Sequence, residues 1–134
     1  MITMKKEFTY KGKTLEEIKA FSIKELADIM PARQRRSLLR GFTDAQKILL
    51  AEVKKHNEGK SKKTIKTHCR DMMVLPNMVG MDILVYSGKV FDQVNVQENM
   101  IGHLLGEFVL TRKRGTHSAP GVGATRSSAS VSVK

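Results

Sequence analysis

The strongest constraint on the fold is a change in hydrophobic period after the first 60 residues. That first part contains three capping-box patterns, in each of which a Ser or Thr is followed three residues later by Glu or Gln. The patterns begin at Thr14, Ser22 and Thr43, and apolar residues at helical spacing follow each one. Three helices are therefore predicted, and the second ends before Pro31 because proline lacks an amide donor.

The helix that begins at Thr43 is expected to run over residues 43–56 and to end near Gly59. One side of it carries an apolar stripe of the kind that packs a helix against a core. The predicted stripe consists of Ala45, Ile48, Leu49 and Val53.

Beyond residue 60 the period changes to that of strands. Residues 64–70 alternate between apolar and polar side chains, which predicts a half-buried strand. Its basic outer face consists of Lys66, His68 and Arg70. Residues 82–86 and 90–96 also have strand composition, and a Ser-Gly-Lys turn at 87–89 joins them into a predicted hairpin. Residues 98–105 predict a short helix.

Charge divides the same sequence into three parts. Residues 1–60 carry 14 basic and eight acidic residues, residues 61–110 carry five of each, and residues 111–134 carry five basic residues and no acid. The last part has almost no large apolar residue to offset its ordering entropy, so it is expected to be disordered. We therefore predict an α+β protein: a helical basic N-terminal extension, a core with a small three-stranded sheet that includes a β-hairpin and is packed by helices, and a basic flexible C-terminal tail.

Composition excludes several classes of function. The net charge of +11 favours a polyanionic partner. No apolar run approaches the roughly 20 residues of a membrane helix, so no membrane contact is expected. The sequence has neither the His and Cys spacing of metal sites nor a Walker-type glycine loop, so we expect no metal, cofactor, small-molecule substrate or enzymatic activity. Its single cysteine fits a reducing, cytoplasmic compartment.

Basic clusters supply the candidate binding residues. On a helix over residues 32–40, Arg33, Arg36 and Arg40 lie one above another, which costs stability unless an anion neutralises them. Guanidinium groups bind two phosphate oxygens at once, so RNA or DNA phosphate is favoured over a merely solvated face. A second cluster lies in residues 54–70. Two of its lysines, Lys54 and Lys55, stand at the C-terminal end of a predicted helix, where a positive charge also interacts favourably with the helix dipole. A third lies in the tail, where a solubilising terminus is the alternative.

The full set of predicted nucleic-acid-binding residues combines these clusters with the basic side chains between them. They are Arg33, Arg35, Arg36, Arg40, Lys54, Lys55, Lys60, Lys62, Lys63, Lys66, His68, Arg70, Lys89, His103, Arg112, Lys113, Arg114, His117 and Arg126. We expect the hairpin and its neighbouring strand to present Lys66, His68, Arg70 and Lys89 to folded RNA.

A long spaced motif runs from residue 87 to residue 111. It consists of Ser87-Gly88-Lys89, Val96, Ile101-Gly102, Leu105-Gly106-Glu107-Phe108 and Thr111. In residue types and gaps this motif resembles the signature of the S-nineteen family of small-subunit ribosomal proteins. Residues 32–36 and 120–125 resemble the archaeal and eukaryotic branch of that family, whose eukaryotic member is S-fifteen, whereas residues 128–134 depart from it.

The resemblance implies a structural protein, not an enzyme, in the head of the small ribosomal subunit. Family members bind the 3′ domain of the small-subunit rRNA and adjoin the S-thirteen ribosomal protein. They direct a C-terminal tail toward the decoding region and the tRNA sites, which here corresponds to Thr111 onward. The alternatives from other classes are a DNA-binding or chromatin-like basic module and an adaptor for acidic proteins.

Overall fold

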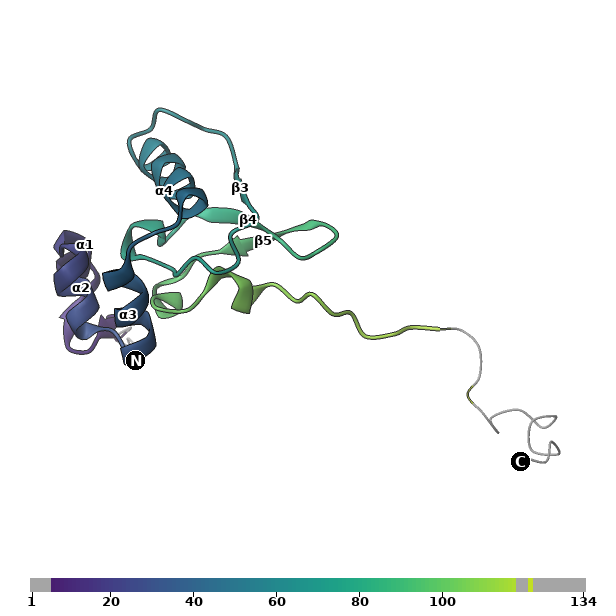
Figure 1. Cartoon of the computed structure of the whole chain (residues 1–134), viewed down its shortest axis with the longest axis horizontal. Coiled ribbons are helices and arrows are strands. Elements are labelled where there is room, and N and C mark those ends of the chain that lie inside the picture. The colour runs from purple at the N-terminus through teal and green to yellow at the C-terminus, as the bar shows by residue number, and fades with distance from the viewer. Residues whose placement is uncertain (1–5, 118–120, 122–134) are drawn as a thin grey trace, which may run out of the picture.

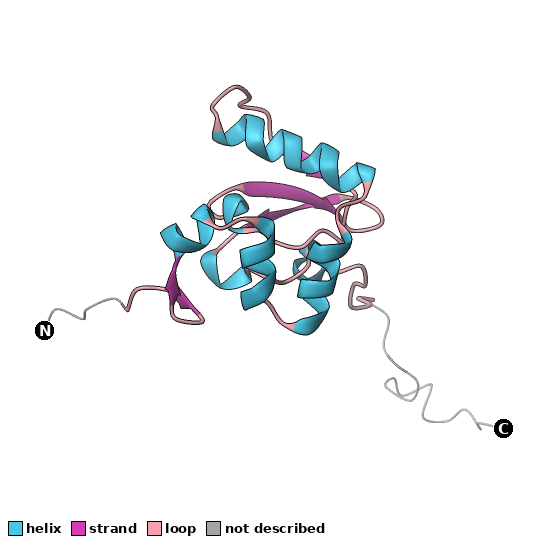
Figure 2. Cartoon of the chain, turned by 60° about the vertical axis from the view of Figure 1, so that its left-hand side comes forward, coloured by secondary structure: helices cyan, strands magenta, loops and turns pink. Residues whose placement is uncertain are grey.

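The computed structural model describes residues 6–117 and residue 121, and in this part of the chain helices pack together with a short sheet (Figure 2). The α-helices are α1 (Leu15–Ala20), α2 (Ile23–Ile29), α3 (Ala32–Arg40) and α4 (Asp44–Asn57). The three-stranded sheet consists of β3 (Ile65–Thr67), β4 (Asp82–Tyr86) and β5 (Phe91–Asn95). Figure 1 shows α1, α2 and α3 grouped at one end and the turn between β4 and β5 at the other. The predicted α+β class is confirmed.

The three predicted capping boxes all begin helices. In the second, the Ser22 amide donates to the Glu25 carboxylate at 2.7 Å, and the Glu25 amide donates to the Ser22 hydroxyl at 3.4 Å. The hydrogen bonds from the Ser22 backbone and side chain lower the pKa of the Glu25 carboxyl. This cap is therefore fully formed at neutral pH and weakens as the pH falls through that lowered pKa. The helix ends at Met30, whose backbone is extended because Pro31 follows.

The position of α4 is as predicted, but the prediction of which residues form its apolar stripe is wrong in part. Leu49 and Val53 are buried, whereas Ala45 is exposed and Ile48 has 62% of its surface exposed. Leu50 lies half-buried against the core instead. The helix is thus rotated so that the row containing Leu49, Leu50 and Val53 faces inward, since an apolar stripe about 100° wide cannot include every apolar position.

Strand β3 is shorter than the strand predicted over residues 64–70, because the backbone turns directly after Thr67. The Thr67 hydroxyl accepts a hydrogen bond from the Cys69 amide at 3.0 Å. The Arg70 amide donates to the His68 carbonyl at 2.8 Å. Alternation therefore stops at Thr67, and Arg70 lies half-buried and directed inward, not on the outer face as predicted.

Strand β4 is the centre of the sheet. It pairs in parallel with β3 and antiparallel with β5, which confirms the predicted hairpin. Ile83 and Val85 have no exposed surface, whereas Leu84 and Tyr86 on the other side of the strand are half-buried. One face of the sheet therefore packs on the core, and the other face is open to solvent.

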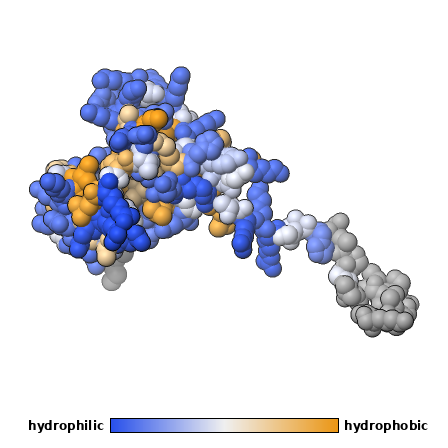
Figure 3. Space-filling view, viewed as in Figure 1, coloured by the Kyte–Doolittle hydropathy of each residue, from blue (hydrophilic) through white to orange (hydrophobic). Residues whose placement is uncertain are grey.

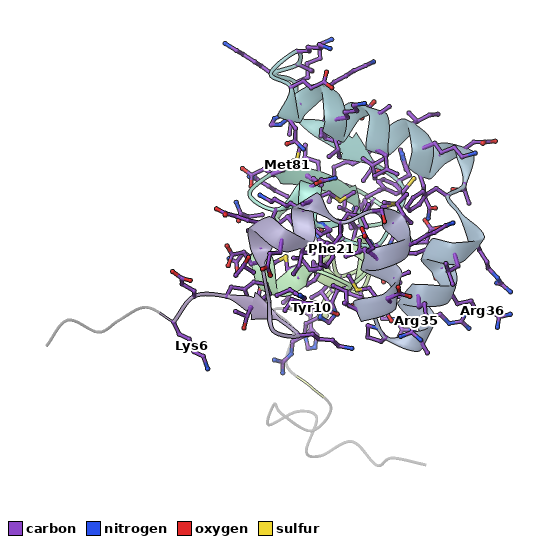
Figure 4. All side chains as sticks on the ribbon, turned by 90° about the vertical axis from the view of Figure 1, so that its left-hand side faces the viewer. Lys6, Tyr10, Phe21, Arg35, Arg36 and Met81 are labelled. Atoms are coloured by element: carbon purple, nitrogen blue, oxygen red, sulfur yellow. The ribbon has the colours of Figure 1, made fainter. Side chains whose placement is uncertain are left out.

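Residues before α1 also pack on the body, where no element was predicted. The strands β1 (Thr9–Tyr10) and β2 (Lys13–Thr14) form a short hairpin. The Tyr10 hydroxyl donates to the Met30 sulfur at 3.4 Å, and burial raises the pKa of this hydroxyl. The same sulfur lies 3.2 Å from the position that a Cβ on Gly102 would take. The N-terminal region, in which Figure 4 labels Tyr10, is thus in contact with the second half of the chain.

The helix predicted over residues 98–105 is wrong. Two short 3-10 helices stand at its ends instead, η2 (Glu98–Met100) and η3 (Leu105–Phe108). Between them Gly102 has a φ of 87°, which ends helical geometry. The Gly102 amide donates to the Val74 carbonyl at 3.1 Å, and the Val74 amide donates to the His103 carbonyl at 2.8 Å. Backbone pairing with a distant buried segment therefore replaces local helical hydrogen bonds.

Gly106 provides a test of this packing. A Cβ added to Gly106 would lie 2.9 Å from both the Cβ and the carbonyl oxygen of Arg70. We expect Gly106→Ala to lower the free energy of unfolding by about 1–3 kcal/mol, because overpacking forces the backbone to move. Urea denaturation measures the effect, with Gly115→Ala as the control because its Cβ would meet nothing within 4 Å. Equal midpoints for the two variants would contradict the prediction.

Candidate nucleic-acid interface

The outer face of α3 gathers three of the predicted arginines. Arg33, Arg36 and Arg40 are exposed and border the same stretch of surface, together with the exposed Leu39. Leu38 is buried and holds the opposite side of the helix against the core. Within residues 6–117 none of the three arginines forms an ion pair. Their positive charge is thus available to an anionic partner.

Arg35 lies on the same helix but is bound by the fold. Its Nε donates to the Ala27 carbonyl at 3.1 Å, and its Nη2 donates to the carbonyls of Asp28 and Met30, both at 3.2 Å. These carbonyls belong to the C-terminal end of α2, where a helix leaves acceptors without intrahelical partners. Arg35 therefore joins α2 to α3, and Figure 4 labels it beside Arg36.

Arg70 also binds backbone carbonyls. Its Nη1 donates to the Tyr86 carbonyl at 2.7 Å. Its Nη2 donates to the carbonyls of Gly106 at 2.8 Å and of Val109 at 2.7 Å. The side chain thus connects the end of β4 to the segment from which the chain continues into residues 111–117. All three hydrogen bonds direct its guanidinium group into the fold.

The second basic cluster comes together between the end of α4 and β3. Lys55, Lys63 and Lys66 border a cavity of about 370 Å³, whose other lining residues are Glu52, His56, Ser61, Thr64 and Ile65. Lys60 is exposed but forms an ion pair with Glu58 at 2.6 Å. Lys54 and Lys62 are also exposed, outside the cavity. The cavity therefore concentrates three lysines and a histidine around one acid.

The turn between β4 and β5 presents a further cation. The Ser87 side chain is buried, and its hydroxyl donates to the Val90 carbonyl at 2.8 Å. Gly88 has a φ of 101°, a conformation that favours glycine. Lys89 is exposed at the tip. The first three residues of the spaced motif thus build a tight turn that carries one lysine.

The remaining predicted residues lie toward the C-terminus. His103 places its Nδ1 2.8 Å from Oε2 of Glu107, and its ring packs edge-on against Phe108. Four predicted residues are exposed in a segment without regular secondary structure: Arg112, Lys113, Arg114 and His117. Arg126 and residues 128–134 lie outside the described residues, as does most of the predicted flexible tail.

The sequence patterns did not indicate a group of rings on the open face of the sheet. The centroid of the His68 ring lies 4.6 Å from that of Tyr86 and 5.1 Å from that of Phe91. The Tyr86 and Phe91 centroids lie 5.2 Å apart. Lys66 places its Nζ 5.7 Å from the Phe91 centroid. The predicted hairpin register could have revealed two of these residues, because a Ser-Gly-Lys turn sets Tyr86 opposite Phe91.

The described surface is predominantly hydrophilic over α4 and over the segment that leaves the body (Figure 3). No helix in residues 6–117 is long and apolar enough to span a membrane. In the same part of the chain, no three His, Cys, Asp or Glu side chains group closely enough to hold a metal ion. The features of this part that could bind a partner are thus its basic surfaces and the rings of His68, Tyr86 and Phe91.

Comparison with known proteins identifies the family. The family described as Ribosomal protein S19 matches residues 36–117. The small ribosomal subunit protein uS19 of the archaeon Cenarchaeum symbiosum (strain A) is 49% identical over 131 residues, covering 98% of this chain and 100% of the relative. The chain belongs to the S-nineteen family of ribosomal proteins. This is a family of structural proteins and not of enzymes, so both the resemblance and the expected absence of catalysis are confirmed.

The two matches differ in how much of the chain they include. The S-nineteen family match begins at Arg36, inside α3, whereas the archaeal uS19 aligns with nearly the whole chain. Residues before Arg36 therefore belong to what this chain shares with its archaeal relative. They supply α1, α2 and the Arg35 contacts that fix α3.

Replacing Arg70 tests whether this arginine serves the fold. We expect Arg70→Gln to lower the free energy of unfolding by about 2–3 kcal/mol, because half-buried carbonyls lose charged hydrogen-bond donors. Lys66→Gln removes the same charge from an exposed position nearby and is expected to leave stability within about 0.5 kcal/mol. Urea denaturation of both variants measures the difference. If Arg70→Gln kept the wild-type midpoint, the structural role would be wrong.

Proposed function

We propose that this protein is a structural component of the small ribosomal subunit that binds the 3′ domain of its rRNA in the subunit head. The observation that carries the proposal is the outer face of α3, where Arg33, Arg36 and Arg40 are exposed and form no ion pair with any residue of the described part of the chain. Family membership in the ribosomal S-nineteen proteins supports the same conclusion. The ribosome would place the protein in the cytoplasm.

Recognition would depend mainly on the shape of the RNA. A-form RNA hides its base edges in a deep, narrow groove, so the phosphates and 2′-hydroxyls are what a protein reaches. The cations of this chain lie on separate elements: the outer face of α3, the cavity beside β3 and the turn at Lys89. Contacts at three separated places would fix the orientation of the protein on a folded RNA.

The C-terminal segment has a different proposed role. Family resemblance favours a path from Thr111 toward the decoding region and the tRNA sites, with the S-thirteen protein as a neighbour in the head. Arg70 supports this proposal because it fixes the carbonyl of Val109, two residues before that path begins. Arg112, Lys113 and Arg114 then follow without an intervening acid. The proposed division is thus a basic extension over 1–60, a core over 61–110 and a basic tail over 111–134.

Removing charge from α3 tests the RNA contact. If about eight phosphates are neutralised, the logarithm of affinity should fall with the logarithm of salt concentration at a slope of about −6 to −7. The double variant Arg33→Gln with Arg36→Gln is expected to weaken binding to a head-domain rRNA fragment and to reduce that slope by about 1 to 2, with an unchanged unfolding midpoint. Filter binding across salt concentrations measures both quantities.

The control for this experiment removes the same charge elsewhere. Lys19→Gln with Lys24→Gln neutralises two exposed lysines on α1 and α2, outside the predicted interface. This control should keep nearly wild-type affinity. Equal losses in the two double variants would show that net charge alone governs binding and that α3 has no specific role.

Sedimentation tests the proposal as a whole. A tagged full-length copy is expected to sediment with small ribosomal subunits and to leave these particles after ribonuclease digestion. In solution, the head-domain rRNA fragment should compete for the protein much more strongly than duplex DNA of equal length. Equal competition would support the DNA-binding alternative, and sedimentation unaffected by nuclease would favour an adaptor bound to protein.

A further inference from the structure

The open face of the sheet carries a compact set of aromatic rings, here named the aromatic platform: His68, Tyr86 and Phe91. Tyr86 and Phe91 face each other across β4 and β5 in the strand register, and His68 follows the end of β3. The three centroids lie within 5.2 Å of one another. Lys66 occupies the same face, because it pairs in register with Leu84 and residues two apart on a strand share a face.

The platform is not part of the hydrophobic core. Ile83 and Val85, on the opposite face of β4, have no exposed surface. Tyr86 and Phe91 are only half-buried, and His68 is exposed. Rings that served only to fill the core would be covered by a helix, as the inner face is. Three neighbouring rings with accessible surface on an open sheet face instead offer a contact area to a partner.

The rings are held in place before any partner binds. The Tyr86 hydroxyl donates to the Gly88 carbonyl at 2.9 Å, which fixes the orientation of this ring against the turn. The Phe91 centroid lies 5.1 Å from that of His68, edge to face, and 5.7 Å from Lys66 Nζ, which sits over the ring. Pre-ordered side chains lose little conformational entropy on binding, so such a platform favours a rigid, flat ligand.

The cations beside the platform indicate which kind of ligand it binds. Lys66 borders the rings and also the cavity that it shares with Lys55 and Lys63. A nucleotide has both required parts, since its base has a π face that stacks on aromatic side chains and its phosphate binds ammonium groups. Lysine is depleted in the cores of protein interfaces, which argues against a protein as the occupant.

We propose that the aromatic platform stacks one unpaired base of the small-subunit rRNA and that Lys66 binds a phosphate next to that base. The proposal rests on the proposed rRNA-binding function and adds a site to it. The base must be unpaired because a paired base in an A-form helix does not expose its π face. A bulge, a loop or a helix end in the folded RNA is therefore the segment that meets this face of the sheet.

The absence of tryptophan from the sequence permits a direct test. Phe91→Trp would introduce a single tryptophan into the platform, and stacking of a base would quench its fluorescence. The full-length variant is titrated with the head-domain rRNA fragment, and saturable quenching is expected over the concentration range in which the wild type binds. The control is Ile48→Trp, since Ile48 is exposed on α4, which contributes no ring to the platform, and a tryptophan there should show little quenching.

Salt dependence separates the two parts of the site. Phe91→Leu removes the π face but keeps an apolar side chain, and it is expected to weaken binding about 10-fold without changing the salt slope, because stacking releases no counterions. Lys66→Gln is expected to reduce the slope by about 1. If Phe91→Leu fails to fold, the fluorescence of Phe91→Trp still decides the question.

The outcomes distinguish this proposal from the function on which it rests. Intact RNA binding by Phe91→Trp without quenching, or by Phe91→Leu at wild-type affinity, would overturn the platform proposal and leave rRNA binding in place. Failure of the wild-type protein to bind the fragment would overturn rRNA binding itself. A fluorescence change in assembled subunits that survives ribonuclease digestion would assign the platform to a protein partner and also overturn the proposal.

Discussion

The second half of the fold depends on one side chain, the guanidinium group of Arg70. Its three hydrogen bonds join the end of β4 at Tyr86 to the carbonyls of Gly106 and Val109. A half-buried carbonyl that lacks a hydrogen-bond donor lowers stability by about as much as the loss of one hydrogen bond. Removing the Arg70 guanidinium group would leave three such carbonyls without this donor. The close approach also requires Gly106, since any Cβ there would meet Arg70 at 2.9 Å.

The same reasoning explains much of the spaced motif in physical terms. Ser87 and Gly88 close the hairpin turn, and Gly102 adopts a positive φ beside the Met30 sulfur. Gly106 permits the approach of Arg70. These motif residues fix the backbone and do not themselves present charge. The motif therefore identifies the family mainly through its fold. Lys89 is its one exposed cation among the candidate RNA contacts, and the others lie around the motif.

Local features of the fold were predictable from the sequence, whereas contacts between distant segments were not. The capping boxes and the hairpin turn were recognised because the partners are within four residues of each other. The helix over 98–105 failed because its backbone pairs with Val74. Arg35 and Arg70 hydrogen-bond to backbone carbonyls, and the sequence alone does not reveal this role because a guanidinium group binds carbonyl and phosphate oxygens alike.

The arginines that bind backbone carbonyls, Arg35 and Arg70, have a consequence for binding. Arg35 ties α3 to the end of α2, so the helix that carries Arg33 and Arg36 is held in a fixed orientation. Arg70 similarly fixes the strand end that carries Tyr86. Charged groups on rigid elements lose less entropy when they bind than the same groups on a mobile chain. The chain thus uses part of its positive charge to position the rest, and a folded RNA of matching phosphate spacing would gain from that rigidity more than a flexible polyanion.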